Sequence, residues 1–325
     1  MGGGGDADGR GTRGYRVLID AHSHILSLAA DPEFTAAYGR EGSLCIFRSM
    51  GVLPSHRMPT DDEWEASGYS GRGWPLIGPA ESLRDHPGFD KIVVLAVSPQ
   101  HLDGRLIGTV DTGGSLGVPG PPDPERCNDY VAAVVRADPD RFIGFASVNP
   151  AFRGVPAAVA ELRRAVQELG LSGAKLYPMY QHWSPADRDL AFPVYEAAGE
   201  LGIPVMIHQA GSTRIDASLE LGRPALLDDI GRCFRDLRVI VAHCGHPWVD
   251  EALFLLLHRC EPMFVPLEKL FFGTDYPGFL YDPVALAEKV RTVNEEADPL
   301  GLDPFPQHKL DGLLGDNFAR FLGLA

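Results

Sequence analysis

The sequence has few cysteines and no arrangement of them that would build a disulfide framework or a cysteine zinc site. Five cysteines occur among 325 residues, and no two of them form a CxxC pair. The first residues, MGGGGDADGRG, contain no apolar stretch of the kind that a signal peptide requires. We therefore expect a reduced, cytoplasmic protein.

Long apolar runs and an excess of basic residues are also missing. No apolar run approaches the ~18 residues needed to cross a membrane, which argues against a membrane protein. Lys and Arg number 29 against 44 Asp and Glu, giving a formal net charge of −15. Nucleic acids and anionic membranes require basic patches, so neither is expected as a partner. A small-molecule substrate is expected instead, and it can be anionic because one local arginine can override the overall field.

Short β-branched runs alternate with stretches of helical periodicity from residue 15 onward. This order predicts a parallel sheet covered by helices. Seven strands and a weaker eighth candidate favour a (β/α)8 barrel of the TIM type over an open sheet. The predicted strands are Tyr15–Asp20, Lys91–Val97, Arg141–Val148, Gly173–Tyr177, Pro204–His208, Val239–His243 and Leu270–Asp275, and the predicted helices are 124–138, 155–169, 186–202, 223–235, 247–259, 283–296 and 307–323.

Two segments depart from this alternation. Residues 1–14 predict a flexible tail, and residues 28–88 predict a lid-like excursion after the first strand of a single domain, 15–325. Only 31 residues (244–274) then remain for a helix, a seventh strand and another helix. The seventh β/α unit is therefore expected to be distorted or incomplete, or to be completed in an oligomer such as a homodimer.

Two histidines follow the first predicted strand in the sequence Asp20-Ala21-His22-Ser23-His24. Because strand side chains alternate with a period of two, we expect Asp20, His22 and His24 to point to the same side. Two imidazoles on one side can chelate one divalent cation, and Asp20 would support these ligands from behind without binding the cation itself. An HxH pair alone is a weak motif.

Three further polar residues each end an apolar strand: His208 in PVMIH, His243 in VIVAH and Asp275 in LFFGTD. The carboxyl ends of parallel strands meet at one rim of a barrel, where such folds place their chemistry. A single histidine after a strand is more often a capping or solvated residue, but several on separate strands are hard to produce by chance. They predict a divalent metal site, with Zn²⁺ preferred and Mn²⁺, Fe²⁺ or Co²⁺ as alternatives.

The motifs IDAHSHI, PVMIHQ, VIVAHCGHP and FFGTDYP, in this order, resemble the amidohydrolase superfamily. The most similar branch is the amidohydrolase-related group typified by aminocarboxymuconate semialdehyde decarboxylase, and the likeness covers most of residues 15–325. The resemblance implies that His22, His24, His208 and Asp275 are the ligands of one metal ion. It also implies that His243 is a catalytic acid/base or polariser rather than a ligand.

Two cationic residues are harder to assign. Arg48, in CIFRSM, matches by resemblance an arginine that holds a substrate carboxylate, but a solvated surface arginine is the simpler interpretation. Lys175, in GAKLYP, departs from the decarboxylase branch and looks like the fourth-strand lysine of dihydroorotase, which is carbamylated and bridges two metals. A carbamylated Lys175 would let His208 and His243 bind a second ion. The alternative is a lysine that pairs with an acid or holds the substrate as a plain cation.

These residues suit two reactions and leave a third interpretation open. Metal-activated water, with Asp275 as proton carrier and His243 polarising the carbonyl, would hydrolyse an amide, a cyclic amide or a lactone. The same residues would serve a non-oxidative decarboxylase, in which Asp275 or the metal water protonates the substrate carbon. Lys175 favours hydrolysis, which we expect, while the whole-chain likeness favours decarboxylation. The third interpretation, an inactive ligand-binding barrel, is disfavoured by the presence of Asp275 together with the histidines.

Overall fold

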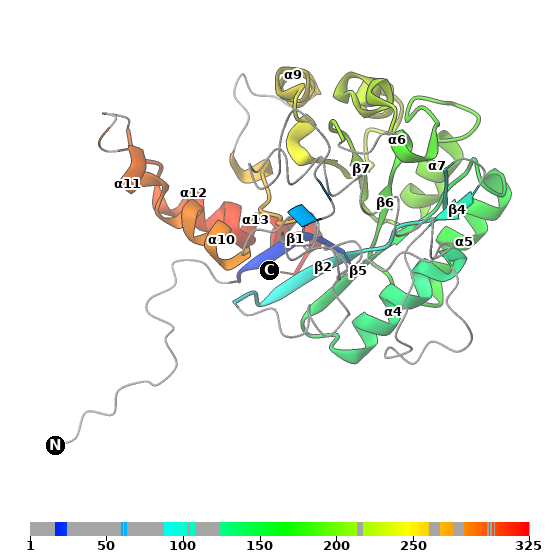
Figure 1. Cartoon of the computed structure of the whole chain (residues 1–325), viewed down its shortest axis with the longest axis horizontal. Helices are drawn as coiled ribbons and strands as arrows, with labels where there is room; N and C mark the ends of the chain where they lie inside the picture. Colours follow the sequence, from blue (N-terminus) through cyan, green and yellow to red (C-terminus); the bar gives the residue numbers. More distant parts are fainter. Residues whose placement is uncertain are drawn as a thin grey trace.

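The computed structural model describes residues 17–24, 60, 62–63, 88–102, 105–107, 124–212, 217–259, 267–275, 283–297, 299, 301 and 303–324. Its centre is a six-stranded parallel sheet whose strands are ordered as they occur along the chain (Figure 1). The carboxyl ends of these strands therefore lie at one rim. The strands are β1 (Ile19–His24), β2 (Lys91–Leu95), β5 (Phe142–Ser147), β6 (Gly173–Leu176), β7 (Val205–His208) and β8 (Val239–Ala242).

Helices connect the strands, and most of the longer ones lie where sequence periodicity predicts them. The exceptions are short elements, such as the single-turn helix α6, which the sequence analysis did not predict. The α-helices are α4 (Cys127–Ala137), α5 (Val155–Gln167), α6 (Pro178–Gln181), α7 (Phe192–Glu200), α8 (Asp228–Cys233), α9 (Val249–Arg259), α10 (Pro283–Arg291), α11 (Val293–Ala297), α12 (Gln307–Asp311) and α13 (Asn317–Leu322). A short antiparallel hairpin, β3 (Gln100–Leu102) and β4 (Arg105–Ile107), stands apart from the main sheet.

The two faces of the sheet bury different side chains. On β6, Ala174 and Leu176 belong to the large apolar core between the sheet and helices α4, α5 and α7. The opposite, inner face carries Phe145 and Met206, which pack in a second core with Phe318 of α13. Figure 1 shows α4 and α5 outside the strands, with α13 beside β1. The alternation along each strand therefore decides which side chains face the interior.

The segment Leu270–Asp275 lies along the free edge of β1. Two backbone hydrogen bonds join it to β1, one of them from the Asp275 N–H to the His22 carbonyl at 2.7 Å. The Phe272 N–H instead donates to the Leu313 carbonyl at 3.0 Å, so the ladder is too short to form a regular strand. The prediction of a strand here was wrong, although the segment occupies the edge where the last strand of a barrel belongs.

The described residues form a half-barrel, and they do not confirm the full (β/α)8 barrel, with a distorted or incomplete seventh unit, that the sequence predicts. Between β8 and Leu270–Asp275 the described chain contributes α9 and the turn Leu267–Lys269, while residues 260–266 lie outside the described part. A cavity of about 840 Å³ is lined by β8 on one side and by Phe271 and Gly273 on the other. It coincides with the short stretch in which a seventh β/α unit was expected to be incomplete.

Several expectations concern residues outside the described part. These are the tail 1–14, nearly all of the excursion 28–88, and Arg48 within it. In the described part of the chain, no helix is long and apolar enough to cross a membrane. The described cysteines, Cys127, Cys233 and Cys244, are free thiols.

Candidate metal centre

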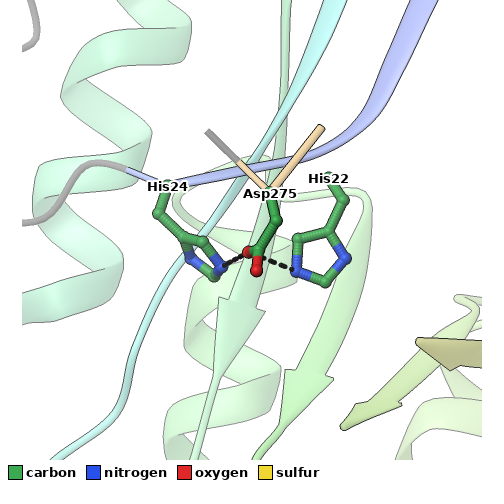
Figure 2. Close-up of side chains that lie close together, drawn as sticks. All are labelled: His22, His24 and Asp275. Atoms are coloured by element: carbon green, nitrogen blue, oxygen red, sulfur yellow. Dashed lines mark ion pairs between the residues drawn. The ribbon is translucent and has the colours of Figure 1, made fainter. Parts of the chain in front are cut away.

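His22, His24 and Asp275 form a compact cluster at the carboxyl end of β1. The Nε2 atoms of His22 and His24 lie 3.3 and 3.1 Å from the same oxygen, Oδ1 of Asp275. Figure 2 shows the carboxylate placed between the two imidazoles, which point toward it from positions two residues apart on the same strand. One ligand atom from each residue lies within 4.8 Å of the other two, so the three atoms can face a single ion.

The electrostatics of the cluster suit metal ligation. Burial, followed by the positive charge of Lys175 and of the neighbouring histidines, lowers the pKa of His22 well below its ordinary value of 6.5. A histidine must be neutral to bind a metal, so this shift keeps His22 ready to ligate at neutral pH. Burial raises the pKa of Asp275, but the hydrogen bond with His24 and nearby positive charge outweigh it, and the net pKa is lowered.

The donor set itself fits a divalent cation. His22 Nε2 is buried and makes no hydrogen bond to any described residue, and it lies beside the Asp275 carboxylate. Two imidazoles and a carboxylate are ligands that Zn²⁺ and Mn²⁺ accept. A buried nitrogen without a hydrogen-bond partner costs free energy of folding. A cation bound by this nitrogen and the neighbouring carboxylate would remove that cost.

Asp20 lies on the other side of β1 from the two histidines, contrary to the expected alternation. The pairing of β1 with β2 shifts register between Asp20 and Ser23, and this irregularity displaces the alternation by one residue. Asp20 therefore shares its side with Ser23, whose hydroxyl donates to Asp20 Oδ2 at 2.7 Å. The Asp20 carboxylate also accepts the backbone N–H of His22 at 3.1 Å.

The same carboxylate binds the segment that carries Asp275. The backbone N–H and the hydroxyl of Thr274 donate to Asp20 at 2.9 and 2.5 Å. Burial raises the pKa of Asp20, while these hydrogen bonds and the one from Ser23 act to lower it. Asp20 contacts no imidazole ring in these interactions, so its support for the cluster acts through the backbone that carries the ligands.

Two residues of the site have a backbone conformation that is uncommon outside glycine. Asp275 and His243 adopt φ angles of 55° and 59°. Such left-handed residues cost free energy and tend to be retained at functional sites. Close approach is also needed at Gly273, because a Cβ there would lie 2.8 Å from Cβ of His22. Glycine at 273 therefore lets the Asp275 segment come near β1.

His208 and His243 form a second pair beside the cluster. Nδ1 of His208 lies 3.0 Å from Nε2 of His243, and the ring of His243 lies 4.8 Å from that of His22, centroid to centroid. Burial lowers the pKa of His243 to about 4, so its ring is neutral at neutral pH. His208 also faces the hydroxyl of Tyr180 at 3.3 Å. The expected fourth ligand thus lies next to the three-residue cluster, with both ring nitrogens engaged by other side chains.

Lys175 is the remaining candidate near the cluster. Its side chain is completely buried on β6, and among the described residues its Nζ has no hydrogen-bond partner. Nζ lies 5.2 Å from the centroid of the Tyr177 ring. Burial lowers the pKa of Lys175 to about 7, against an opposing attraction from Asp275. The expectation that this lysine pairs with an acid is therefore not met by any direct contact in the described chain.

Three residues of the site were not singled out in the sequence. Thr274 immediately precedes Asp275. Its role is to donate hydrogen bonds to Asp20, and the local sequence does not show this because Asp20 lies far away along the chain. Tyr177 and Tyr180 flank the start of α6, and their rings lie 6.3 and 4.9 Å from that of His208, centroid to centroid. A signal was available for both, because Pro178 directly after a strand is typical of a helix start.

The chain matches the family model described as Amidohydrolase over residues 19–261, which is most of its length. It therefore belongs to the amidohydrolase family, as its motifs predicted. The matched range contains the parallel sheet described above and His22 and His24 of the cluster, while Asp275 lies beyond it.

Curated relatives share only part of their length with this chain. A 2-amino-3-carboxymuconate-6-semialdehyde decarboxylase of Dictyostelium discoideum is 26% identical over 237 residues, covering 61% of this chain and 65% of the relative. A 2-keto-4-carboxy-3-hexenedioate hydratase of Sphingobium sp. is 35% identical over 94 residues, or 27% of each chain. Decarboxylase orsB of Emericella nidulans is 30% identical over 177 residues, covering 45% of this chain and 50% of the relative. The matches thus span less than two thirds of each relative.

Solved structures share the fold along nearly the whole chain. A 5-carboxyvanillate decarboxylase from Novosphingobium aromaticivorans, with bound manganese, superimposes with a TM-score of 0.58 at 15% identity, covering 95% of this chain and 97% of that one. A 2,6-dihydroxybenzoate decarboxylase from Rhizobium gives 0.51 at 14% identity, covering 95% and 99%. At these identities the likeness concerns the fold alone.

Proposed function

We propose that this chain is a metal-dependent decarboxylase that removes CO₂ non-oxidatively from a small carboxylic acid. The observation that carries the proposal is the cluster of His22, His24 and Asp275, whose three ligand atoms lie close enough together to bind one ion. Two of the three curated relatives are named as decarboxylases. This choice replaces hydrolysis, which the sequence analysis preferred, as the first candidate.

The residues of the cluster would hold one divalent cation. Zn²⁺ remains the expected ion, and Mn²⁺, the ion in the 5-carboxyvanillate decarboxylase structure, is the alternative. When bound, the ion supplies Lewis-acid polarisation of a substrate oxygen. His208 remains a candidate for a further ligand, and the enzyme is expected to be cytoplasmic with its thiols reduced.

Asp275 and His243 would handle the proton. In decarboxylation the bond between the substrate carbon and its carboxylate breaks, CO₂ leaves, and the carbon takes up one proton. Asp275 is about a quarter exposed, at 23%, and lines the cavity, so it can receive a proton from solvent and deliver it. His243, neutral because of its lowered pKa, can donate a hydrogen bond that orients the substrate.

Hydrolysis is the second candidate, and one observation favours it. His208 and His243 lie 3.0 Å apart, nitrogen to nitrogen, next to the cluster. If Lys175 were carboxylated by CO₂, these two histidines could hold a second ion in the manner of a two-metal hydrolase. A lysine that remains unmodified removes this candidate's support.

The test measures which bond is broken. Purified protein with its metal content determined would be incubated with 5-carboxyvanillate, 2,6-dihydroxybenzoate and other small aromatic and unsaturated acids, and with lactones and cyclic amides. Decarboxylation in D₂O is expected to release CO₂ and to leave one deuterium on the carbon that lost it. Hydrolysis of a lactone or cyclic amide, with no CO₂ from any acid, would contradict the proposal and establish the second candidate.

A further inference from the structure

Lys175 is a buried amine for which the described protein provides no hydrogen-bond acceptor. Its exposed fraction is 0%, and Nζ lacks a partner among the described residues. Lysine is almost never fully buried unless it is paired. Burying such a group without a partner costs free energy, so a retained lysine of this kind indicates a ligand that completes the pair.

The position of Lys175 on β6 directs its side chain to the inner face of the sheet. Its neighbours on the strand, Ala174 and Leu176, belong to the outer core. Its partner in register on β7 is Met206, which belongs to the inner core. Paired residues of parallel strands share a side, so Lys175 points inward, as Met206 does.

The surroundings of Nζ are those of the metal cluster. The Tyr177 ring, which lies under Nζ at 5.2 Å, has its centroid 6.4 Å from the ring of His24 and 6.3 Å from that of His208. The Tyr177 hydroxyl donates to the Ala96 carbonyl at 3.0 Å, so it is not directed at Nζ. The aromatic ring therefore holds the lysine beside the histidines without satisfying its hydrogen-bonding capacity.

Lys175 is the one lysine in the described interior around the cluster, which also contains four histidines and the carboxylate of Asp275. Asp275 would be occupied by the cation of the proposed site. The lysine would then be left without a counter-charge unless the substrate brings one.

We propose that Lys175 binds a carboxylate of the substrate, one that the metal ion does not hold. This inference rests on the proposed function because it places the carboxylate beside the same metal cluster. It makes Lys175 a specificity-determining residue that selects acidic substrates through a charge-assisted hydrogen bond. The role expected for Arg48 from the resemblance is thereby assigned to a residue of the described chain.

A carbamate is the competing fate of this side chain. The reaction of the amine with CO₂ gives R–NH–COO⁻ and releases one proton, with no oxidant or reductant involved. The product is an anion, so it would repel a carboxylate instead of binding one. The two fates therefore predict opposite preferences for charged ligands.

The experiment uses the full chain freed of metal by a chelator, so that its outcome is independent of decarboxylation. Benzoate and its neutral analogue benzamide are the probes, and binding is measured by calorimetry for the wild type and for Lys175→Met, Lys175→Gln and Lys289→Met. Lys289 is an exposed lysine on α10, so its substitution is matched in charge. The wild type and Lys289→Met are expected to bind benzoate about tenfold or more tightly than benzamide, and both Lys175 variants to lose this preference.

Several outcomes would overturn the inference. They are an equal affinity of the wild type for the two probes, no binding of either, a preference kept by a Lys175 variant that circular dichroism shows to be folded, or an intact mass raised by one CO₂ at Lys175. Failure of the proposed function gives a different result. A wild type that prefers benzoate through Lys175, but releases no CO₂ from any acid tested, keeps this inference and loses the decarboxylase.

Discussion

Thr274 donates two hydrogen bonds to the carboxylate of Asp20, one from its backbone N–H at 2.9 Å and one from its hydroxyl at 2.5 Å. Asp20 precedes His22 on β1 by two residues, and Thr274 immediately precedes Asp275. The pair therefore fixes the histidines and the carboxylate of the cluster relative to each other. Because Ser23 and the His22 N–H also donate to Asp20, the carboxylate is surrounded by donors.

Replacement of Asp20 by asparagine is expected to weaken both the fold and the cluster. The amide NH₂ would face donors, so at least one buried hydrogen bond becomes a repulsive contact, at a cost of about 2–3 kcal/mol of unfolding free energy. Displacement of the backbone should weaken metal binding by about 10–100-fold. Urea unfolding and metal titration measure the two effects. The exposed Asp303→Asn is the control, and an Asp20→Asn variant that matches it would contradict the role of Asp20.

His22→Ala and His24→Ala are expected to lose metal and activity together. Each substitution removes one imidazole from a three-residue ligand set, and the remaining two ligands cannot hold the ion with comparable affinity. Metal content per chain after dialysis and the rate of CO₂ release are the measurements. His308→Ala, at an exposed position on α12, should keep both. Activity that persists in metal-free protein would remove the metal from the mechanism.

Asp275→Asn is expected to reduce kcat much more than it changes KM. Asparagine tolerates the left-handed conformation at this position, where φ is 55°, so the backbone should stay in place. Loss of a group that moves a proton typically costs about 10²–10⁴-fold in rate. The rate must be compared at full metal occupancy, measured in the same sample. Turnover near that of the wild type would show that another group carries the proton.

Gly273→Ala tests whether close approach of the two segments is required. An added Cβ would lie 2.8 Å from Cβ of His22, so the Asp275 segment must move away from β1. We expect weaker metal binding and lower stability. Gly199→Ala is the matched control, because its Cβ would contact nothing within 4 Å and the position lies in helix α7. Equal effects of the two substitutions would show that the spacing is not critical.

The buried Lys175 should make stability depend on pH. Burial lowers its pKa from 10.5 to about 7, against the attraction of Asp275. Between these values the unfolded chain holds one more proton than the folded chain, so stability should rise with pH, by up to about 1.4 kcal/mol per unit. Below pH 7 both states hold the proton, so the slope vanishes and the destabilisation by the buried ammonium is at its full size. The measurement is the difference in unfolding free energy between metal-free wild type and Lys175→Met across this window, and a constant difference would contradict the lowered pKa of Lys175.

The strands of the main sheet between residues 91 and 242 could be predicted because each is a short apolar run, whereas the hairpin of β3 and β4 was not predicted. Lys91–Leu95 and Val205–His208 lie within the predicted ranges and differ by one or two residues at their ends. The motifs also identified the family. The short stretch 244–274 predicts a distorted or incomplete seventh unit because chain length limits what can be built, and residues 260–266, on which this prediction depends, lie outside the described part.

The geometry around Asp20 could not be predicted from its local sequence. The pattern Asp20-Ala21-His22 has the regular period of a strand, and the register shift that places Asp20 on the opposite side from His22 is tied to hydrogen bonds from Thr274. Such long-range contacts leave no local pattern. The environment of Lys175 could not be predicted either. The sequence around it predicts a strand, but it does not show that the buried amine lacks a hydrogen-bond acceptor among the described residues.

The distance along the chain between Asp20 and Thr274, 254 positions, has a consequence for biosynthesis. The ribosome makes both histidines of β1 long before the carboxylate of Asp275. A nascent polypeptide that has not yet reached Asp275 therefore contains an HxH pair that lacks its acidic partner and the segment that positions it. Loading of the proposed ion is then expected only after β1 and the Asp275 segment have come together.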